Sequence, residues 1–132
     1  GLTYGVASAV CHSLKAIIKR ERPFVASNSV VNMLPANGFS MPSGHSVSAA
    51  VITTFLLYLI ISSNLKKRTK AVLGTLTSLI LPLVMLSRMF LGQHYLSDTI
   101  VGAVIGVAIA IGGIFVFRFV SRRFLNGHRK NS

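Results

Sequence analysis

Three long stretches without a charged side chain constrain the fold of this chain more than any other feature. They cover residues 46–65, 71–87 and 99–117, and the first is 20 and the third 19 residues long. About 20 apolar residues in a helix cross the hydrocarbon core of a bilayer. A further uncharged stretch, residues 1–14, opens the chain. We therefore expect an all-α integral membrane helical bundle with about four spanning helices.

The composition argues against several classes of function. The formal net charge of +12 first suggests nucleic acid, but 52% of the residues are hydrophobic. The cations also gather at the ends of the uncharged stretches, as membrane-flanking residues do, so we expect no nucleic-acid partner. Cys11 is the only cysteine, which excludes an internal disulfide and a cysteine-based zinc site. Glu21 and Asp98 are the only acids, too few for a typical magnesium or two-metal site, so we expect no metal and no cofactor.

Proline and glycine residues predict where the helices end, bend and pack. The first helix should end at Pro23, because the residue before a proline avoids the α region. Residues 24–41 have turn chemistry and predict a loop, and Pro82 predicts a kink in the uncharged stretch 71–87. Gly102 and Gly106 have a spacing that suits close helix packing. That packing could lie within one chain or between two, so the oligomeric state stays open.

The order of the helices places the polar segments on two sides of the membrane. Residues 15–22, 42–46 and 88–98 fall on one side, and the basic loop predicted at residues 66–70 and the irregular tail predicted at residues 118–132 fall on the other. The second side carries nine Lys and Arg residues and the first carries five. Cytoplasmic loops carry an excess of Lys and Arg. We therefore expect segment 66–70 and the C-terminal tail to be cytoplasmic and the other face to be extracytoplasmic.

A candidate phosphate cradle lies where the uncharged stretch 46–65 begins. Ser43 is a natural helix N-cap, and Gly44 allows a ligand to come close to the backbone. The free N–H groups and the positive dipole end of the following helix favour an anion there. His45 would stand in the first turn beside that anion as a proton-transfer group. The alternative is a capped helix start with an incidental histidine, because short motifs also occur by chance.

A second polar junction contains Arg88, His94 and Asp98. His94 and Asp98 are four residues apart, so they would face each other on a helix. A carboxylate on one ring nitrogen fixes the tautomer and leaves the other nitrogen with a lone pair for attack. The alternative is that Asp98 only caps a helix and His94 only lies at the interface. Ionisable groups beside a bilayer are functional by default, and Arg88 is then a candidate phosphate contact.

The first polar junction supplies further cations. Lys15 and Arg22 are seven residues apart, so they would share one helix face, with Lys19 on the same side. For Lys19 and Arg20 we favour a cationic helix end at the interface, and for His12 a packed or hydrogen-bonded helix residue. The three junctions together would bind a phosphate-like oxyanion. Phosphoryl transfer needs little beyond positioning, charge stabilisation, a nucleophile and a proton donor.

Three motifs, in this order, resemble the signature of the type 2 phosphatidic acid phosphatase (PAP2) superfamily. They are K-x6-R-P at residues 15–23, P-S-G-H at 42–45 and S-R-x5-H-x3-D at 87–98. The resemblance implies a metal-independent phosphatase on an all-α core, of the membrane branch that acts on lipid phosphates. Membrane members usually have about six spanning helices. We therefore expect residues 1–132 to be a single PAP2-type domain that lacks N-terminal helices.

The resemblance also implies a role for each site residue. His94 would attack phosphorus and form a phosphohistidine, Asp98 would orient it, and His45 would protonate the leaving oxygen and then activate water. The phosphate oxygens would be held by Lys15, Arg22, Ser43, Gly44 and Arg88. The substrate would be a lipid phosphomonoester or pyrophosphate, such as phosphatidate, phosphatidylglycerol phosphate or an isoprenyl pyrophosphate. Two alternatives stay open: a phosphotransferase with an alcohol acceptor, and a non-enzymatic anion-binding membrane subunit.

Overall fold

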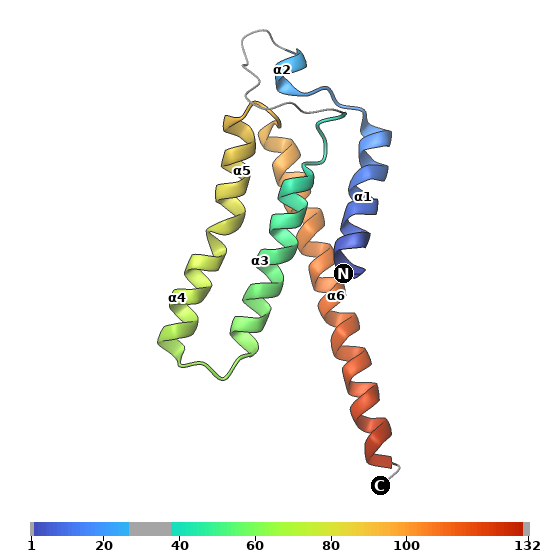
Figure 1. Ribbon diagram of the computed structural model, residues 1–132, viewed down its shortest axis with the longest axis vertical. Coiled ribbons are helices and arrows are strands. Elements are labelled where there is room, and N and C mark those ends of the chain that lie inside the picture. Colours follow the sequence, from blue (N-terminus) through green and yellow to red (C-terminus); the bar gives the residue numbers. More distant parts are fainter. Residues whose placement is uncertain (1, 27–37, 131–132) are drawn as a thin grey trace.

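The computed structural model describes residues 2–26 and 38–130, and within them it is all-helical. The helices are α1 Leu2–Ile18, α2 Pro23–Ala26, α3 Gly44–Ser62, α4 Lys67–Ser78, α5 Ile80–Phe90 and α6 Leu96–Lys130. The end of α1, the start of α3, the end of α5 and the start of α6 lie at the same end of the bundle, close to α2 (Figure 1). The predicted all-α fold is confirmed.

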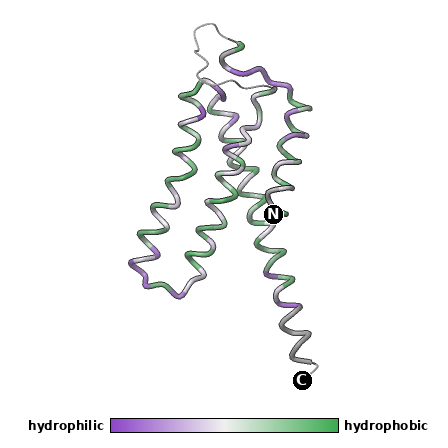
Figure 2. The backbone as a smooth tube through the Cα atoms, in the orientation of Figure 1, coloured by the Kyte–Doolittle hydropathy of each residue, from purple (hydrophilic) through white to green (hydrophobic). Residues whose placement is uncertain are grey.

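The described residues contain three helical stretches that are long and apolar enough to cross a membrane. They are Gly44–Ser62, Lys67–Phe90, which combines α4 and α5, and Leu96–Arg123. Hydrophobic residues follow these helices along their length, and hydrophilic residues gather at the turns between them (Figure 2). Gly5–Ile18 is a shorter apolar helix. The 17 residues of α1 extend roughly 25 Å, less than the ~30 Å of a bilayer core. The predicted fourth helix is therefore present, and its described residues fall short of a full span.

The central helix of the bundle is α3, which contacts α1, α4, α5 and, most closely, α6. Two glycines of α6 make that closeness possible. A Cβ on Gly102 would lie 2.7 Å from the carbonyl oxygen of Ser43, and a Cβ on Gly106 would clash with the carbonyl oxygen of Val47. Only a residue without a Cβ lets the two backbones approach this far. The predicted close packing at these glycines therefore occurs within one chain.

A small apolar core lies where α1, α3 and α6 meet. Ala7 and Cys11 of α1 are buried against Val47 and Val51 of α3, and the partly buried Ile105 of α6 packs on this cluster. Most other large apolar side chains are exposed, as expected for helix faces that meet lipid tails instead of water. The core thus holds together the starts of α3 and α6, where the polar junctions lie.

The predicted kink at Pro82 is confirmed, and its position follows from proline geometry. The helix is interrupted at Leu79, between the end of α4 at Ser78 and the start of α5 at Ile80. Proline has no N–H for the carbonyl four residues earlier, here that of Ser78, and its ring crowds that carbonyl. Regular bonding resumes when the N–H of Leu83 donates to the carbonyl of Leu79 at 3.1 Å.

The first helix ends earlier than predicted. α1 ends at Ile18, because Lys19 adopts a positive φ of 48°, the left-handed conformation that commonly closes helices. The N–H of Lys19 still donates to the carbonyl of Lys15 at 3.1 Å. Pro23 does not end α1 but opens α2, a position at which the missing N–H costs no helical bond. The prediction therefore placed the end of the first helix too late.

Three segments predicted to be irregular are helical. Residues 24–26 of the predicted loop belong to α2, and its residues 27–37 lie outside the described residues. The predicted tail from Arg118 continues α6 as far as Lys130, and residues 67–70 form the first turn of α4. Extending an existing helix costs far less than nucleating one, and Lys and Arg are good helix formers. Charge therefore marked the end of the apolar stretch and not the end of the helix.

Candidate active site

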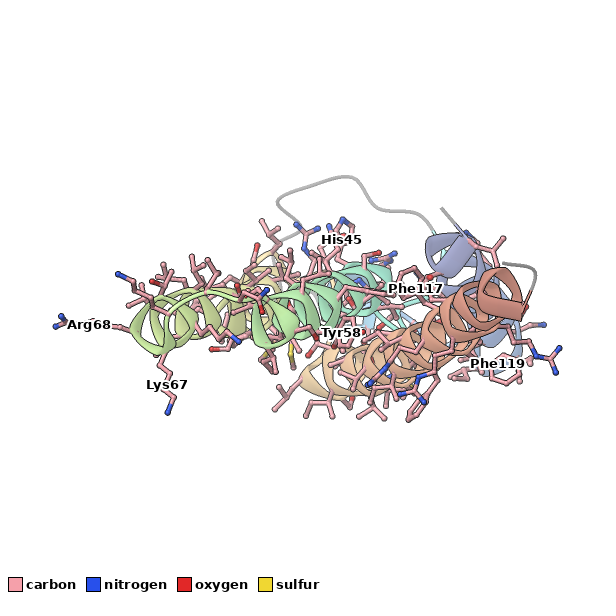
Figure 3. All side chains as sticks on the ribbon, turned by 90° about the horizontal axis from the view of Figure 1, so that it is seen from below. His45, Tyr58, Lys67, Arg68, Phe117 and Phe119 are labelled. Atoms are coloured by element: carbon pink, nitrogen blue, oxygen red, sulfur yellow. The ribbon has the colours of Figure 1, made fainter. Side chains whose placement is uncertain are left out.

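The polar junctions that the sequence placed on one face lie together at one end of the bundle (Figure 1). His45 stands in the first turn of α3, and its side chain projects outward from the helix (Figure 3). Lys15, Arg22 and Arg88 lie close enough to His45 to repel a positive charge on its ring. The structure thus brings together three cations from three different segments around the start of α3.

Asp98 lies in the first turn of α6 and has no exposed surface. Its Oδ2 accepts the backbone N–H of Tyr95 at 2.9 Å. In this geometry an acidic side chain in the first turn accepts a hydrogen bond from the backbone N–H of the N-cap residue of its own helix. A negative charge here also suits the positive end of the helix dipole. The capping role considered for Asp98 is therefore present, together with contacts to other segments.

His94 lies just before α6 and not on it. The prediction that His94 and Asp98 face each other across a helical turn is wrong about the backbone, because α6 begins only at Leu96. A turn that contains Gly92, at φ 66°, instead places His94 next to the start of α6. The Nδ1 atom of His94 is nevertheless 3.9 Å from Oδ2 of Asp98. That distance is too long for a hydrogen bond, but it places a buried imidazole beside a buried carboxylate.

Ser43 is the N-cap of α3, as predicted from the sequence. Its Oγ accepts the N–H of Ser46 at 3.4 Å and the hydroxyl of Ser46 at 3.1 Å, which leaves its own proton to donate. The N–H of Ser43 donates to the carbonyl of Asp98 at 3.0 Å and joins the first turns of α3 and α6. A Cβ on Gly44 would make only an ordinary 3.6 Å contact with Sγ of Cys11. The protein itself therefore does not require glycine at position 44.

Arg22 is buried and bound to the segment that carries His94. Its Nε donates to the carbonyl of Gly38 at 3.0 Å. Its Nη1 donates to the backbone carbonyl of Gln93 at 3.2 Å and to the side-chain Oε1 of the same residue at 3.3 Å. Gln93 is itself buried and directly precedes His94. The position of this guanidinium is therefore coupled to the position of the histidine.

Lys15 and Arg22 are close to each other, but they do not share a helix face as predicted. Lys15 lies in the last turn of α1, and Arg22 lies in the connection to α2. The left-handed residue Lys19 ends α1 between them and redirects the chain. Lys19 itself is exposed and does not lie on the same helix face. A turn, not a helical repeat, brings the two cations together.

Arg88 lies in the last turn of α5, at the edge of the same cluster. Its Nε is buried and has no hydrogen-bond partner among the residues that the structure describes. A buried donor without a partner costs free energy. An anion beside His45 would accept this hydrogen bond and pair with the charge, which fits the predicted phosphate contact.

Sequence reasoning missed three residues around Asp98 and Arg22: Arg20, Ser40 and Gln93. Arg20 was interpreted as an interfacial cation, but its Nη1 forms a 2.8 Å ion pair with Oδ1 of Asp98. Ser40 donates its hydroxyl to Oδ2 of the same carboxylate. A signal existed for Arg20, since a carboxylate in an apolar bundle needs a cation. The sequence held no such signal for Ser40 or Gln93.

The surroundings of His94 lower its pKa from 6.5 to about 4. Burial is the largest cause, because it disfavours the charged ring, and the positive charges of Arg22 and Lys15 act in the same direction. The backbone of Ser40 and the carboxylate of Asp98 oppose the shift. At neutral pH the imidazole is therefore uncharged and keeps a nitrogen lone pair, which a nucleophile requires.

This shift predicts the titration of His94 in solution. Nitrogen NMR of the imidazole should show a neutral ring at about pH 5.5, where an ordinary histidine is mostly protonated. The unfolded chain binds this proton more tightly, so the free energy of unfolding should decrease as the pH falls from 6.5 toward about 4. Arg22→Gln should raise the pKa of His94, and Arg118→Gln, far along α6, should not. A wild-type ring that titrates near pH 6.5 would contradict the prediction.

The described residues contain no group of three or more His, Cys, Asp or Glu side chains that could hold a metal ion. The polar groups at this end of the bundle are mainly cations and imidazoles, which suit an anion. The expectation that the chain uses no metal and no cofactor stays a prediction.

Comparison with known families agrees with this geometry. The family model described as the PAP2 superfamily matches residues 1–125. The chain belongs to the PAP2 superfamily. A curated relative, phosphatidylglycerophosphatase B of Bacillus subtilis (strain 168), is 31% identical over 109 residues. The match covers 82% of this PAP2 chain and 51% of the relative.

Two solved structures share the fold of this PAP2 chain. One is a transmembrane PAP2 type phosphatidylglycerolphosphate phosphatase from Bacillus subtilis, with a TM-score of 0.73 and 26% sequence identity. The match covers 92% of this chain and 57% of that protein. The other is LpxE of Aquifex aeolicus, with a TM-score of 0.69 and 28% sequence identity. The match covers 86% of this chain and 63% of that protein. The chain thus spans between about half and two thirds of the length of these proteins. The apolar helices and this likeness identify it as an integral membrane protein.

Proposed function

We propose that this PAP2 chain hydrolyses a lipid phosphomonoester or pyrophosphate through a phosphohistidine intermediate on His94. One observation carries the proposal: a buried, uncharged imidazole lies 3.9 Å from a buried carboxylate at the end of the bundle where three cations gather. A nucleophile, a group that polarises it and a set of positive charges are the parts that phosphoryl transfer needs. A site that only binds an anion has no use for the first two.

In the first half of the reaction, Lys15, Arg22 and Arg88 would hold the phosphate oxygens together with the start of α3. His94 would attack through Nε2, since Nδ1 is the nitrogen near Asp98. A P–N bond forms while the P–O bond to the lipid breaks. The leaving oxygen takes a proton from His45, which is exposed at the start of α3. The ring would hold this proton because the negative charge of the bound phosphate offsets the three cations.

In the second half, His45 would remove a proton from a water molecule whose oxygen attacks phosphorus. The P–N bond breaks, inorganic phosphate leaves, and both histidines return to their starting states. In both halves Asp98 would stabilise the positive charge that develops on His94. Ser43 and Gly44 would support the phosphate through a hydroxyl and a backbone N–H at the positive end of α3.

The place of the site favours a lipid substrate. All proposed groups lie at the ends of apolar helices, where a lipid head group lies when its tails remain in the bilayer. The curated relative and the first of the two solved structures, both from Bacillus subtilis, are named for phosphatase activity on phosphatidylglycerol phosphate. Phosphatidylglycerol phosphate is therefore the first substrate to test. We also propose that the site faces the extracytoplasmic side, because nine of the 14 Lys and Arg residues belong to segment 66–70 and the C-terminal part of the chain.

Phosphate release in detergent tests the reaction. Phosphatidylglycerol phosphate, phosphatidate and a polyprenyl pyrophosphate are each offered to the full-length protein in excess chelator. The control is the double variant His45→Ala/His94→Ala. Release that persists in chelator and is absent from the double variant supports the proposal. Transfer of the phosphate to an added alcohol instead of water indicates a phosphotransferase. Release no greater than that of the double variant, with every lipid, contradicts the proposal and leaves the anion-binding subunit.

A further inference from the structure

Arg20 binds the turn that carries the proposed nucleophile. It follows the end of α1, and its Nη1 lies 2.8 Å from Oδ1 of Asp98 and 2.7 Å from Oγ of Ser97. The Cζ atom lies 4.3 Å from the centre of the ring of Tyr95, the residue directly after His94. One side chain thus contacts three of the four residues that follow His94. None of these contacts involves a group that would hold a phosphate oxygen in the proposed reaction.

Ser40 completes the surroundings of the same carboxylate. Its hydroxyl donates to Oδ2 of Asp98, and its backbone N–H donates to the carbonyl of Arg20 at 2.8 Å. Oδ2 also accepts the N–H of Tyr95 at 2.9 Å. Both carboxylate oxygens therefore have partners, and Asp98, which is fully buried, cannot rotate without breaking them.

We propose that Arg20, assisted by Ser40, is a positioning residue that fixes the Asp98 carboxylate and thereby sets the orientation and basicity of His94. The inference rests on the proposed function, since it assigns a role in the same reaction. Without Arg20 the carboxylate would carry an unbalanced negative charge 3.9 Å from the ring of His94. That charge would stabilise the imidazolium, and the carboxylate would lose its fixed orientation.

The charged groups around His94 set the reference for a pH measurement. Lys15 of α1, Arg22 of the connection to α2 and Asp98 of α6 act on the ring of His94 directly. Arg88 of α5 acts on His45 of α3 at the same end of the bundle. Arg20 acts on this set through Asp98. Removing Arg20 should therefore raise the pKa of His94, whereas a role limited to holding the bundle together would leave that pKa unchanged in the folded protein.

The test compares Arg20→Gln with Lys19→Gln, which removes the same charge from the adjacent exposed residue. We expect Arg20→Gln to lower kcat by about 10- to 100-fold, the usual effect of losing a group that orients an active-site side chain, with KM changed little. Nitrogen NMR should show the pKa of His94 higher by about one unit. Lys19→Gln should change neither quantity. A folded Arg20→Gln protein with wild-type kcat, or with an unchanged pKa of His94, would overturn the proposal.

Two further variants keep the test decisive if Arg20→Gln does not fold. Arg20→Lys retains the charge but loses the planar guanidinium, so it should lower kcat while the pKa of His94 stays near that of the wild type. Ser40→Ala removes one hydrogen bond to Asp98 and should likewise lower kcat while the pKa of His94 stays near that of the wild type. Wild-type kcat in both variants would also overturn the proposal. A wild-type protein that releases no phosphate contradicts the proposed function instead, and the NMR measurement still tests the coupling of Arg20 to His94.

Discussion

Replacing His94 by alanine is expected to lower lipid phosphate hydrolysis by roughly 10⁴-fold or more, as loss of the nucleophile does in other covalent enzymes. The variant keeps the cations and the start of α3, so it should still bind substrate. The measurement is kcat for phosphate release from the best lipid of the panel. The matched control is His12→Ala. His12 is exposed on α1, and its Nδ1 contacts the carbonyl of Ser8 in the same helix at 2.9 Å, which agrees with its interpretation as a hydrogen-bonded helix residue.

A labelling experiment separates a nucleophile from a general base. With substrate labelled at phosphorus, rapidly quenched wild-type protein should carry label that survives base and is lost in acid, the behaviour of a phosphohistidine. His45→Ala should accumulate more label, because the proposed activation of water is missing. His94→Ala should carry none. Label on the His94→Ala protein, or activity within about 100-fold of the wild type, would show that the nucleophile is another residue.

Replacing Gly106 by alanine is expected to destabilise the bundle and to inactivate the site from a distance. The added Cβ would clash with the carbonyl oxygen of Val47 and lie 2.7 Å from the Cβ of Ala50, so α6 must move away from α3. Overpacking of this kind costs about 1–3 kcal/mol. A shift near 1 Å between the helices that carry His45 and Asp98 should lower kcat by about 100-fold.

Cys11 provides the stability measurement for the glycine variants. It is buried and is the only cysteine of the chain, so a thiol-reactive fluorophore reports its exposure on heating. We expect Gly106→Ala to lower the midpoint of this transition by roughly 5 °C or more. Gly112→Ala is the control, since a Cβ on Gly112 of α6 has no heavy atom within 4 Å. Equal stability and activity of the two variants would mean that α6 does not need the close contact at Gly106.

Hydropathy was sufficient to predict the helical architecture. The uncharged stretches became α3, the pair α4 and α5, and α6, because about 20 apolar residues have few alternatives to a membrane-spanning helix. The errors concern helix ends. The first helix closes at Ile18, not at Pro23, and α6 continues past Arg118 to Lys130. A left-handed residue such as Lys19 leaves no mark in the sequence when it is not glycine.

The sequence grouped the polar junctions correctly but not the partners within them. It placed Lys15, Arg22 and Arg88 on one face with the histidines, and in the structure these cations act together on His45. It interpreted Arg20 as a surface cation, whereas Arg20 pairs with Asp98. Ion-pair partners depend on side-chain positions within a few ångströms, and the spacing of residues along a chain does not contain that information.

The sequence by itself determined which parts of this chain lie in the membrane, which end carries the polar groups and which motifs assign it to the PAP2 superfamily. These features depend on local composition and on the order of segments, so they can be predicted without knowledge of the packing. The tertiary structure alone decided how the reactive groups meet. The glycine contacts of α6 on α3 and the turns at Lys19 and Gly92 set the distances around Asp98, and electrostatic and hydrogen-bond energies change steeply over those distances.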